Sequence, residues 1–274
     1  MNGKASAFLI DTGSDLSFLR ADRASLLGLR ALDKTVRTAG RAFPAGTVAN
    51  LQIGQRHFQN IEFAVLPASE VGQVRRNTTP AEADGILGLD FLRRYVAVIN
   101  CHTLQIFFKT DATPHLNLTR TTKAMGFTRV PIIPYQRDFL TVPSHLNGRL
   151  GRMILDTAAF VTVLSDGVVR EFRITEEPSR LTSRGLDGRV REIELAEVKD
   201  LRIGNVAIAP QRFAVIDLFD SRKPARTHAT LSGLQLDPER RLDSGEPIFG
   251  LLGDELLDQR QGIIDLESMS LFLK

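Results

Sequence analysis

The chain of 274 residues contains one internal repeat, in which three segments recur in the same order in both halves. The pairs are Phe8–Leu19 with Met153–Leu164, Leu51–Val65 with Leu201–Val215, and Gly85–Lys109 with Gly250–Lys274. The third pair aligns without a gap, and only insertions change the spacing between the others. Because the period is much longer than one unit of a solenoid, the pattern predicts two lobes, each a small domain.

Most of the chain has the pattern of β-strands. Short runs rich in Val, Ile, Leu and Phe alternate with turns rich in Gly, Pro, Asn and Asp. Matched short helices are expected at Arg20–Leu29 and Ser165–Phe172, and at Leu89–Tyr95 and Asp254–Arg260. We therefore expect an all-β protein with few short helices, built from two similar lobes.

The repeat also predicts how the chain is divided. We expect residues 1–112 to form the first lobe, 113–136 to connect the lobes, and 137–274 to form the second lobe. The second lobe carries a polar insertion punctuated by Pro and Gly, Leu218–Pro247. We expect this insertion to be a surface loop.

The two lobes differ at their first strand. In the second lobe, the strand "FLTVPSHL" is followed by Asn147-Gly148, a strong hairpin signal, and then by the strand that leads to Asp156. In the first lobe, Asn2-Gly3 stands in the matching place and only Met1 precedes it. We therefore expect this sequence to lack the first strand of the first lobe, and any signal peptide before it. The alternative is a first lobe built without that strand.

Composition narrows the classes of function. Hydrophobic residues make up 43% and charged residues 24%, which is typical of a globular protein. The net charge of +3 is small and the basic residues are scattered, so nucleic acid and anionic membranes are unfavoured partners. No apolar run approaches the roughly 20 residues of a membrane-spanning helix. The single cysteine, Cys101, excludes an internal disulfide and leaves the compartment, exported or not, open.

The repeat places two aspartates, Asp11 and Asp156, at equivalent positions after apolar runs. A buried carboxylate is costly unless it is hydrogen-bonded or paired. Two carboxylates that converge cannot both ionise cheaply, so they share one proton and titrate at separate pKa values. The ionised partner can take a proton from a water that attacks a carbonyl, while the protonated partner stabilises the oxyanion. The pattern therefore indicates paired-carboxylate hydrolysis.

Other residues in the repeat fit this chemistry. The turn after each aspartate offers backbone N–H groups and a threonine hydroxyl, Thr12 or Thr157, to orient the carboxylate. Each lobe also contains an element of two apolar residues followed by glycine, which ends at Gly88 or Gly253. An isolated Asp-Thr-Gly is a weak signal, but its occurrence at the same place in both repeats is much more specific.

These motifs resemble those of the pepsin- and retropepsin-like aspartic proteases. The resemblance lies in Asp11-Thr12-Gly13-Ser14, Asp156-Thr157-Ala158-Ala159, "ADGILGL" from Ala83 and "GLLG" from Gly250. It covers nearly the whole chain except the connection and the insertion. It implies two β-barrel lobes related by a pseudo-twofold axis, with the active site between them. It further implies that Asp11 and Asp156 are catalytic, and that their loops are supported by Thr12, Gly13, Ser14, Thr157, Ala158, Ala159, Gly88 and Gly253.

The resemblance also implies substrate-binding residues. Asp15 resembles the aspartate that holds the substrate backbone in retropepsins, while Phe160 stands in its place in the second lobe. Hairpin flaps that close over the substrate are expected between Thr38 and Val48 and between Ser183 and Val190. Their glycines, suited to tight and mobile tips, are Gly40 and Gly46 in the first flap and Gly185 and Gly188 in the second.

One residue departs from the family pattern. Ala158 stands where the first lobe has Gly13. A methyl group would disturb the site if this position needs a positive φ or close packing. If the site needs only the backbone N–H, alanine supplies it, and we expect activity to survive.

The leading hypothesis is an aspartic endopeptidase that acts on an extended peptide as a monomer. The five histidines lack metal-ligand spacing, so no metal and no cofactor are expected. The runner-up is a protease-like module that binds peptides without cutting them, which Ala158 would favour. A third hypothesis, a purely structural β-domain, is disfavoured by the matched motifs at both aspartates.

Overall fold

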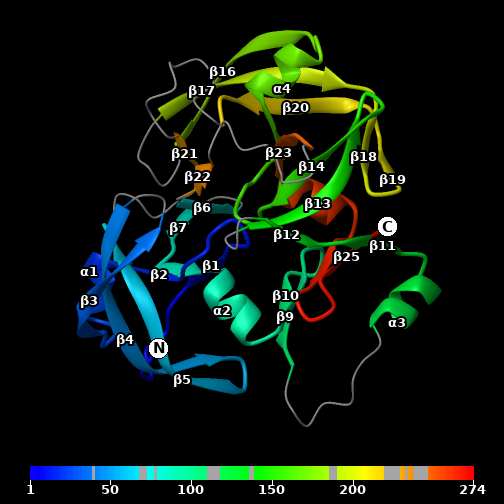
Figure 1. The fold of residues 1–274 in the computed structure, drawn as a ribbon. Coiled ribbons are helices and arrows are strands. Elements are labelled where there is room, and N and C mark those ends of the chain that lie inside the picture. The colour runs from blue at the N-terminus through cyan, green and yellow to red at the C-terminus, as the bar shows by residue number, and fades with distance from the viewer. Residues whose placement is uncertain are drawn as a thin grey trace.

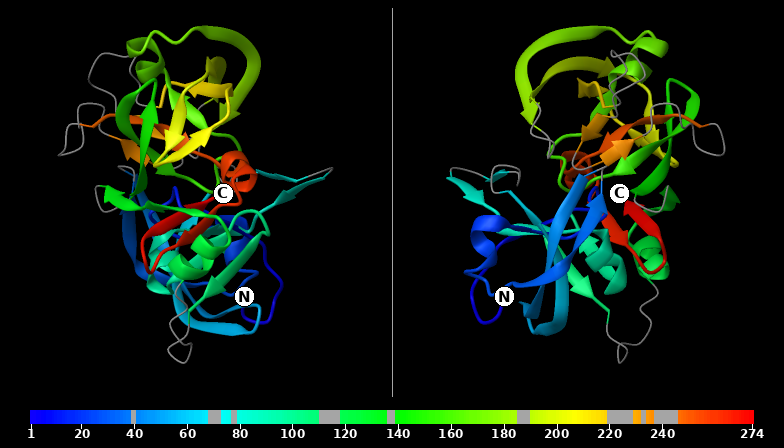
Figure 2. Two further views of the ribbon diagram at one scale, coloured as in Figure 1. Left: turned by 90° about the vertical axis from the view of Figure 1, so that its right-hand side faces the viewer. Right: turned by 60° about the vertical axis from the view of Figure 1, so that its left-hand side comes forward.

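The computed structural model describes residues 1–38, 41–67, 73–76, 79–109, 118–135, 139–184, 190–218, 229–231, 234–236 and 246–274. Strands dominate this part of the chain and its helices are short, as predicted (Figure 1). No helix in the described ranges is long and apolar enough to cross a membrane. Two further views show the blue strands of the N-terminal half below the yellow strands of the C-terminal half (Figure 2).

The first repeat forms a six-stranded sheet with the order β1-β8-β2-β5-β4-β3. Its strands are β1 (Phe8–Ile10), β8 (Gly85–Leu87), β2 (Phe18–Arg20), β5 (Arg56–Leu66), β4 (Arg41–Ile53) and β3 (Arg30–Thr38). Along this order the neighbours are parallel, antiparallel, parallel, antiparallel and antiparallel.

The second repeat has the same order and the same directions, β14-β23-β15-β20-β17-β16. Its strands are β14 (Arg149–Leu155), β23 (Ile248–Leu252), β15 (Val163–Ser165), β20 (Gln211–Ile216), β17 (Val190–Val198) and β16 (Glu176–Arg184). This sheet continues beyond β14 through β13 (Phe139–Leu146), β18 (Leu201–Ile203) and β19 (Val206–Ile208), and β12 (Ile133–Tyr135) pairs with β13.

A third sheet joins the repeats, with the order β10-β9-β24-β25-β11. Its strands are β10 (Gln105–Phe108), β9 (Ala97–Asn100), β24 (Ile263–Asp265), β25 (Ser270–Leu273) and β11 (Thr128–Pro131). Strand β9 of the first repeat pairs with β24 of the second, for example Ile99 opposite Ile264. The repeats are therefore joined by backbone hydrogen bonds as well as by side-chain packing.

The described part of the expected connection, residues 113–136, contains regular secondary structure. It holds α3 (Leu118–Ala124) as well as β11 and β12, which belong to sheets. Backbone pairing with β25 and β13 stabilises these short strands, and that pairing is not visible in a local pattern. Within the insertion, β21 (Ala229–Leu231) pairs with β22 (Leu234–Leu236); β6 (Gln73–Arg76) and β7 (Thr79–Glu82) form another small hairpin.

The matched helices occur in both repeats. They are α1 (Ala21–Ala24) with α4 (Asp166–Glu171), and α2 (Leu89–Arg94) with α5 (Asp254–Gln259). Helix α1 is shorter than predicted, and the chain turns again at Gly28, where φ is +74°. Helices α2 and α5 bury their apolar side chains, such as Leu92 and Leu257, in a core cluster that both repeats share.

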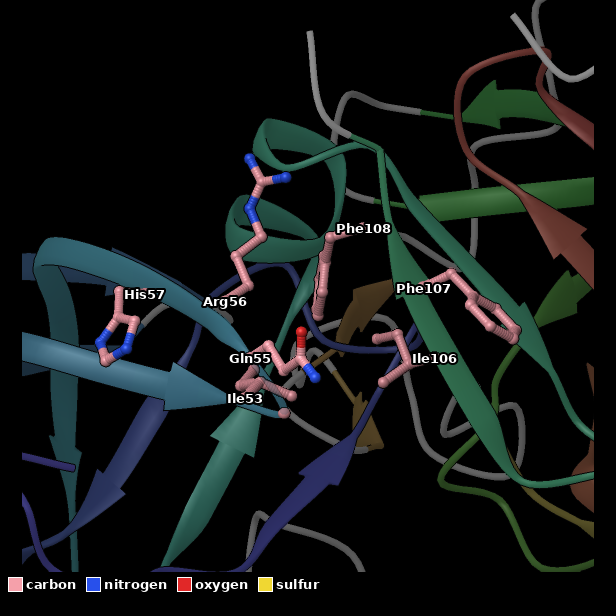
Figure 3. Close-up of a pocket in the computed structure, with 8 residues that line it drawn as sticks. Ile53, Gln55, Arg56, His57, Ile106, Phe107 and Phe108 are labelled. Atoms are coloured by element: carbon pink, nitrogen blue, oxygen red, sulfur yellow. The ribbon is translucent and has the colours of Figure 1, made fainter. Parts of the chain in front are cut away.

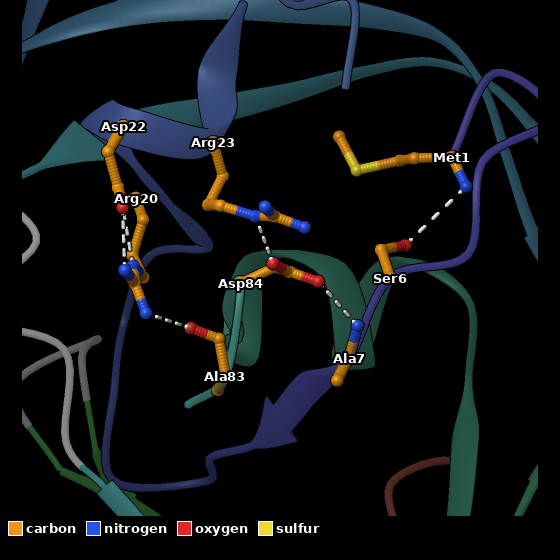
Figure 4. A network of polar contacts seen from close by, with 8 residues as sticks. All are labelled: Met1, Ser6, Ala7, Arg20, Asp22, Arg23, Ala83 and Asp84. Atoms are coloured by element: carbon orange, nitrogen blue, oxygen red, sulfur yellow. Dashed lines mark hydrogen bonds and ion pairs between the residues drawn. The ribbon is translucent and has the colours of Figure 1, made fainter. Parts of the chain in front are cut away.

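A polar network fixes the start of the first repeat (Figure 4). The Asp84 carboxylate accepts from the backbone N–H of Ala7 (2.9 Å) and pairs with Nε of Arg23 (2.5 Å). Arg20 pairs with Asp22 at 2.6 Å and donates to the carbonyl of Ala83 at 3.5 Å. Asp84 thus ties α1 to the residues that lead into β1 and β8, the strands next to the first aspartate turn.

The two Asn-Gly turns have the same backbone conformation. Asn147 and Gly148 have φ of 49° and 74° and join β13 to β14, the predicted hairpin. Asn2 and Gly3 have φ of 45° and 77° and precede β1. Within the described part of the chain, β14 pairs on both sides, with β13 and β23, whereas β1 pairs only with β8.

Candidate active site

The two predicted aspartates lie directly after matching strands. Asp11 follows β1 and Asp156 follows β14, and their exposed fractions are only 2% and 1%. The backbone N–H of Asp11 donates to Leu87 O (3.0 Å) and that of Asp156 donates to Leu252 O (3.1 Å). Because β1 pairs with β8 in the same way as β14 pairs with β23, the two aspartates occupy equivalent positions in their sheets.

Reciprocal hydrogen bonds join the two aspartate turns. The Thr12 hydroxyl donates to Leu155 O (2.9 Å) and accepts from the Thr157 N–H (3.1 Å). The Thr157 hydroxyl donates to Ile10 O (2.6 Å) and accepts from the Thr12 N–H (3.1 Å). We expected these hydroxyls to orient the carboxylates, and that was wrong. Each is occupied by the backbone of the opposite repeat, so the threonines hold the two turns together instead.

Backbone N–H groups orient the carboxylates. The Gly13 N–H donates to Oδ1 of Asp11 at 2.8 Å. The N–H groups of Ala158 and Ala159 donate to Oδ1 of Asp156 at 2.9 and 3.0 Å. In both turns the donors follow the aspartate in sequence, so the tight turn itself fixes the carboxylate.

The third residue of each turn shows why glycine and alanine can both stand there. A Cβ added to Gly13 would lie 2.6 Å from Cγ of Asp156, so the carboxyl group occupies the space that a methyl would need. Neither Gly13 nor Ala158 has a positive φ. Ala158 is half-buried and supplies the N–H that its aspartate accepts. Close packing therefore requires glycine at position 13 but not at Ala158.

The site favours retention of a proton. Burial raises the pKa of Asp11 well above its usual value, and repulsion from Asp156 raises it further, against the N–H groups of Gly13 and Ser14. Burial also raises the pKa of Asp156, against the N–H groups of Ala158 and Ala159 and a hydrogen bond with Asp11. Because repulsion between two carboxylates is mutual, the pair as a whole holds a proton above the usual carboxylate range.

Gly88 and Gly253 allow the chain to cross itself beside the aspartate turns. A Cβ on Gly88 would lie 2.3 Å from Leu16 O, and one on Gly253 would lie 2.5 Å from Val161 O. The next residues, Leu89 and Asp254, donate their N–H to the carbonyls of Ser14 (2.8 Å) and Ala159 (2.7 Å). The Ser14 hydroxyl donates to Leu16 O at 2.8 Å.

A second matched pair in the site was missed by the sequence reasoning. The Ser17 hydroxyl donates to Oδ1 of Asp90 (2.6 Å) and accepts from the Gly88 N–H (3.0 Å). In the second repeat, the Thr162 hydroxyl donates to Oε2 of Glu255 (3.2 Å) and accepts from the Gly253 N–H (3.0 Å). Burial raises the pKa of both acids. An alignment of the two repeats could have predicted these pairs, because a hydroxyl residue and an acidic residue recur at equivalent positions in both repeats.

The predicted substrate-binding residues lie in different parts of the chain, and not all of them lie where we expected. Asp15 accepts from the Thr38 hydroxyl at 2.7 Å, which ties the aspartate loop to the end of β3. Gly46 lies inside β4 opposite Ala31, so its placement at a flap tip was wrong; a Cβ there would lie 2.5 Å from Cγ of Leu29. Gly40, Gly185 and Gly188 lie outside the described residues.

One grouping of possible metal ligands occurs in the described ranges, away from the aspartate turns. The carboxylates of Asp166, Glu176 and Glu194 lie within 4.8 Å of one another. Arg170 neutralises part of this charge, because its Nη2 lies 2.8 Å from Oδ2 of Asp166. An acidic cluster of this kind does not by itself indicate a metal site.

Solved structures with a related fold are distant. The retropepsin-like aspartic protease from Rickettsia conorii is 12% identical and has a TM-score of 0.33, over 54% of this chain and 90% of its own. EIAV protease is 15% identical, with a TM-score of 0.30 over 46% and 93%. Basic 7S globulin from soybean is 12% identical, with a TM-score of 0.46 over 97% and 87%. No curated protein matches the chain significantly.

The family comparison is specific. The model of the aspartyl proteases matches residues 1–91 and 142–256, which together make up more than half of the chain. The first match contains Asp11 and Gly88, and the second contains Asp156 and Gly253. The chain therefore belongs to the aspartyl protease family.

Proposed function

We propose that this chain is an aspartic endopeptidase that hydrolyses peptide bonds with a water activated between Asp11 and Asp156. One observation carries the proposal. Two buried carboxylates with raised pKa values follow matching strands, and reciprocal bonds of Thr12 and Thr157 join their turns. A purely structural domain would gain nothing from two buried acids in one place, because each costs desolvation free energy.

The mechanism assigns a different role to each acid. One aspartate, which we assign as Asp11, holds the shared proton, because two buried carboxylates in one site cannot both ionise cheaply, and it donates a hydrogen bond to the oxygen of the scissile carbonyl. Asp156 is ionised and takes a proton from the water as its oxygen attacks the carbonyl carbon. The proton then passes to the leaving nitrogen as the C–N bond breaks. No covalent intermediate and no cofactor take part.

The substrate is an extended peptide that lies beside the aspartate turns, between the hairpins β3–β4 and β16–β17. Alternate side chains of an extended peptide point to opposite sides, so each wall contacts every second residue. The two walls are unequal, because Asp15 stands in one loop and Phe160, 52% exposed, stands in the other. The enzyme works as a single chain of two duplicated lobes, 1–112 and 137–274, joined by 113–136, and is a monomer.

A second candidate is a module that binds peptides in the same place without cutting them. The observation that favours it is Ala158, whose half-buried methyl group has no counterpart at Gly13. If this methyl group pushed Asp11 out of place, the catalytic water would lose one of the two carboxyl groups that bind it. Binding through Asp15 and the hairpins would remain.

The test is cleavage of a mixed peptide library between about pH 3 and 7.5, which spans carboxylate titration. We expect the wild type to cleave, and Asp11→Asn and Asp156→Asn each to lose at least about 1000-fold in kcat/KM, a little over 4 kcal/mol. The matched control is Asp258→Asn, because that carboxylate is 57% exposed and pairs with His102 at the surface. Peptide capture without cleavage by a folded wild type would favour the binding module, and cleavage that survives both substitutions would overturn the proposal.

A further inference from the structure

Each aspartate turn continues into a loop that ends at a buried hydroxyl, Ser17 in the first repeat and Thr162 in the second. Their exposed fractions are 1% and 0%. A buried hydroxyl needs a hydrogen-bond acceptor, because a polar group left unpaired in the interior is costly. In both repeats the acceptor is an acid in the first turn of a helix, Asp90 in α2 and Glu255 in α5.

Each acid binds its hydroxyl residue twice. Ser17 donates both its hydroxyl and its backbone N–H to the carboxylate of Asp90. Thr162 donates its backbone N–H to Oε2 of Glu255 at 2.6 Å and its hydroxyl to the same oxygen at 3.2 Å. Because an ionised carboxylate only accepts, it draws the hydroxyl hydrogen toward itself and leaves a lone pair of the hydroxyl oxygen for the N–H of a glycine. We call each such set a clasp: Ser17, Asp90 and the Gly88 N–H in the first repeat, and Thr162, Glu255 and the Gly253 N–H in the second.

The first clasp joins the far end of its loop to the segment that also holds the aspartate. At the start of the loop, the N–H of Asp11 donates to Leu87 O at 3.0 Å. At the end of the loop, the next residue of that segment, Gly88, donates its N–H to Oγ of Ser17 at 3.0 Å. Between these points the segment donates two further N–H groups to loop carbonyls. Residues 87–90 therefore hold the loop at its start, its middle and its end.

The second clasp has the same plan. Leu252 O accepts from the N–H of Asp156 at 3.1 Å, and the N–H of Gly253 reaches Oγ1 of Thr162 at 3.0 Å. In both repeats the loop passes so close to the glycine that a Cβ there would lie 2.3 or 2.5 Å from a loop carbonyl oxygen. The glycine thus offers no side chain on which the loop could pack, so the loop depends on hydrogen bonds, and the clasp supplies those at its far end.

We propose that Asp90 and Glu255 are positioning residues for the hydrolysis assigned to Asp11 and Asp156. The inference rests on the proposed function, because it concerns the same two aspartates. Each acid acts through its hydroxyl residue: the clasp keeps the loop closed, and the closed loop fixes the N–H groups that orient the catalytic carboxylate. A misplacement of about 1 Å at a catalytic group can cost about 100-fold in rate. Loss of a clasp should therefore lower kcat, while KM, which reports binding by other residues, changes little.

The test separates the acceptor from the charge. Asp90→Leu and Glu255→Met keep the approximate size of the side chain and remove the acceptor, whereas Asp90→Asn and Glu255→Gln keep an acceptor oxygen and remove the charge. In peptide cleavage we expect the apolar variants to lower kcat at least about tenfold with KM within about twofold, and the amide variants to keep kcat within about threefold. Hydrogen exchange measured by NMR needs no cleavage: the amide of Gly13 should exchange at least about tenfold faster in Asp90→Leu, and that of Ala158 in Glu255→Met.

The matched control is Gln55→Leu, which also replaces an acceptor by an apolar side chain. Gln55 is exposed and lines a groove of about 750 Å³ between the end of the β4–β5 hairpin and β10 (Figure 3). No clasp residue lines this groove, so the control should leave kcat and both exchange rates as in the wild type. If Asp90→Leu does not fold, Ser17→Ala removes the hydroxyl from the same clasp and should shift kcat and Gly13 exchange in the same direction.

The outcomes separate the inference from the proposed function. Unchanged kcat, or unchanged exchange of Gly13 and Ala158, in the apolar variants would overturn the inference. Equal losses in Asp90→Leu and Asp90→Asn would overturn it as well, because a charge at the start of the helix would then be required and not the clasp. A wild type that cleaves no peptide, with the expected changes in exchange, would contradict the proposed function and still support the positioning of the turns by the two acids.

Discussion

The two repeats share one strand order, but equivalent residues in them have different neighbours. At the aspartate turns, Gly13 faces the Asp156 carboxyl, while Ala158 stands at the equivalent position in the second repeat. At the outer edges, Gly204 is covered by Val130 while Gly54 is open. The comparison teaches that glycine has two separate causes: the neighbouring carboxyl requires it at Gly13, where φ is not positive, whereas the positive φ of the turn already favours it at Gly54 and Gly204.

Among the changes that compare the two repeats, the largest expected effect on activity comes from exchanging Gly13 and Ala158, the third residues of the two aspartate turns. Gly13→Ala would place a methyl carbon 2.6 Å from Cγ of Asp156, which forces the carboxyl or the turn to move. We expect kcat/KM for peptide cleavage to fall at least about 100-fold, or about 2.7 kcal/mol. Ala158→Gly removes a methyl that no requirement imposes, and should change kcat/KM by less than about threefold.

Circular dichroism and unfolding curves would serve as the control, because a loss of activity counts only in a folded protein. Equal losses for Gly13→Ala and Ala158→Gly would contradict the inference that the packing requirement falls on one turn alone. A large gain in Ala158→Gly would instead show that the methyl group restrains the natural enzyme.

The reciprocal threonine bonds should dominate the stability of the joined turns. Thr12→Val keeps the shape of the side chain but leaves Leu155 O and the Thr157 N–H without their partner. We expect the free energy of unfolding to fall by about 3 kcal/mol, at the upper end for unsatisfied buried groups. Thr157→Val should cost about 2 kcal/mol, because Thr157 is half-buried and water can reach its partners.

Urea unfolding of the two variants and of Thr12→Val with Thr157→Val together would measure these values. The reciprocal bonds form one network, so the double variant should lose less than the sum of the two single variants. Strict additivity would show that each threonine acts alone.

The aspartates should make stability depend on pH. Their folded pKa values lie above the unfolded value of about 3.9. Their contribution to stability is therefore complete below that pH and is lost as the pH rises through the folded pKa. Asparagine cannot ionise, so the Asp11→Asn variant does not lose stability as the pH rises. At pH 7 its Tm should therefore exceed that of the wild type by roughly 4–8 °C, which corresponds to about 2 kcal/mol for a chain of this size. Calorimetry at pH 7 and pH 3 should find the gain at pH 7 only.

Several parts of this arrangement were predictable from the sequence because the chain repeats. The repeat identified the matching strands before Asp11 and Asp156, the helices α2 and α5, and the turn at Asn147-Gly148. Each of these depends on local pattern, and each occurs twice. The residues that the family model matches include both aspartate turns.

Other parts depend on contacts between distant residues, which a local pattern does not contain. The hydroxyls of Thr12 and Thr157 bond to the opposite repeat, so their partners appear only after the turns meet. Gly46 resembled a flap glycine, but it lies inside β4, where the side chain of Leu29 packs against it. Strand β11 was taken for part of a connection, since nothing in its four residues reveals that β25 offers an open edge.

The smallest expected effect compares the two outer turns. Both glycines have a positive φ, so alanine at either costs about 1 kcal/mol of backbone strain. Gly204→Ala also presses its methyl carbon against Val130 at 3.0 Å, which should add about 1 kcal/mol. Gly54→Ala has no such neighbour and should show the strain alone, as measured by urea unfolding. Equal losses of unfolding free energy in the two variants would mean that Val130 moves aside without cost.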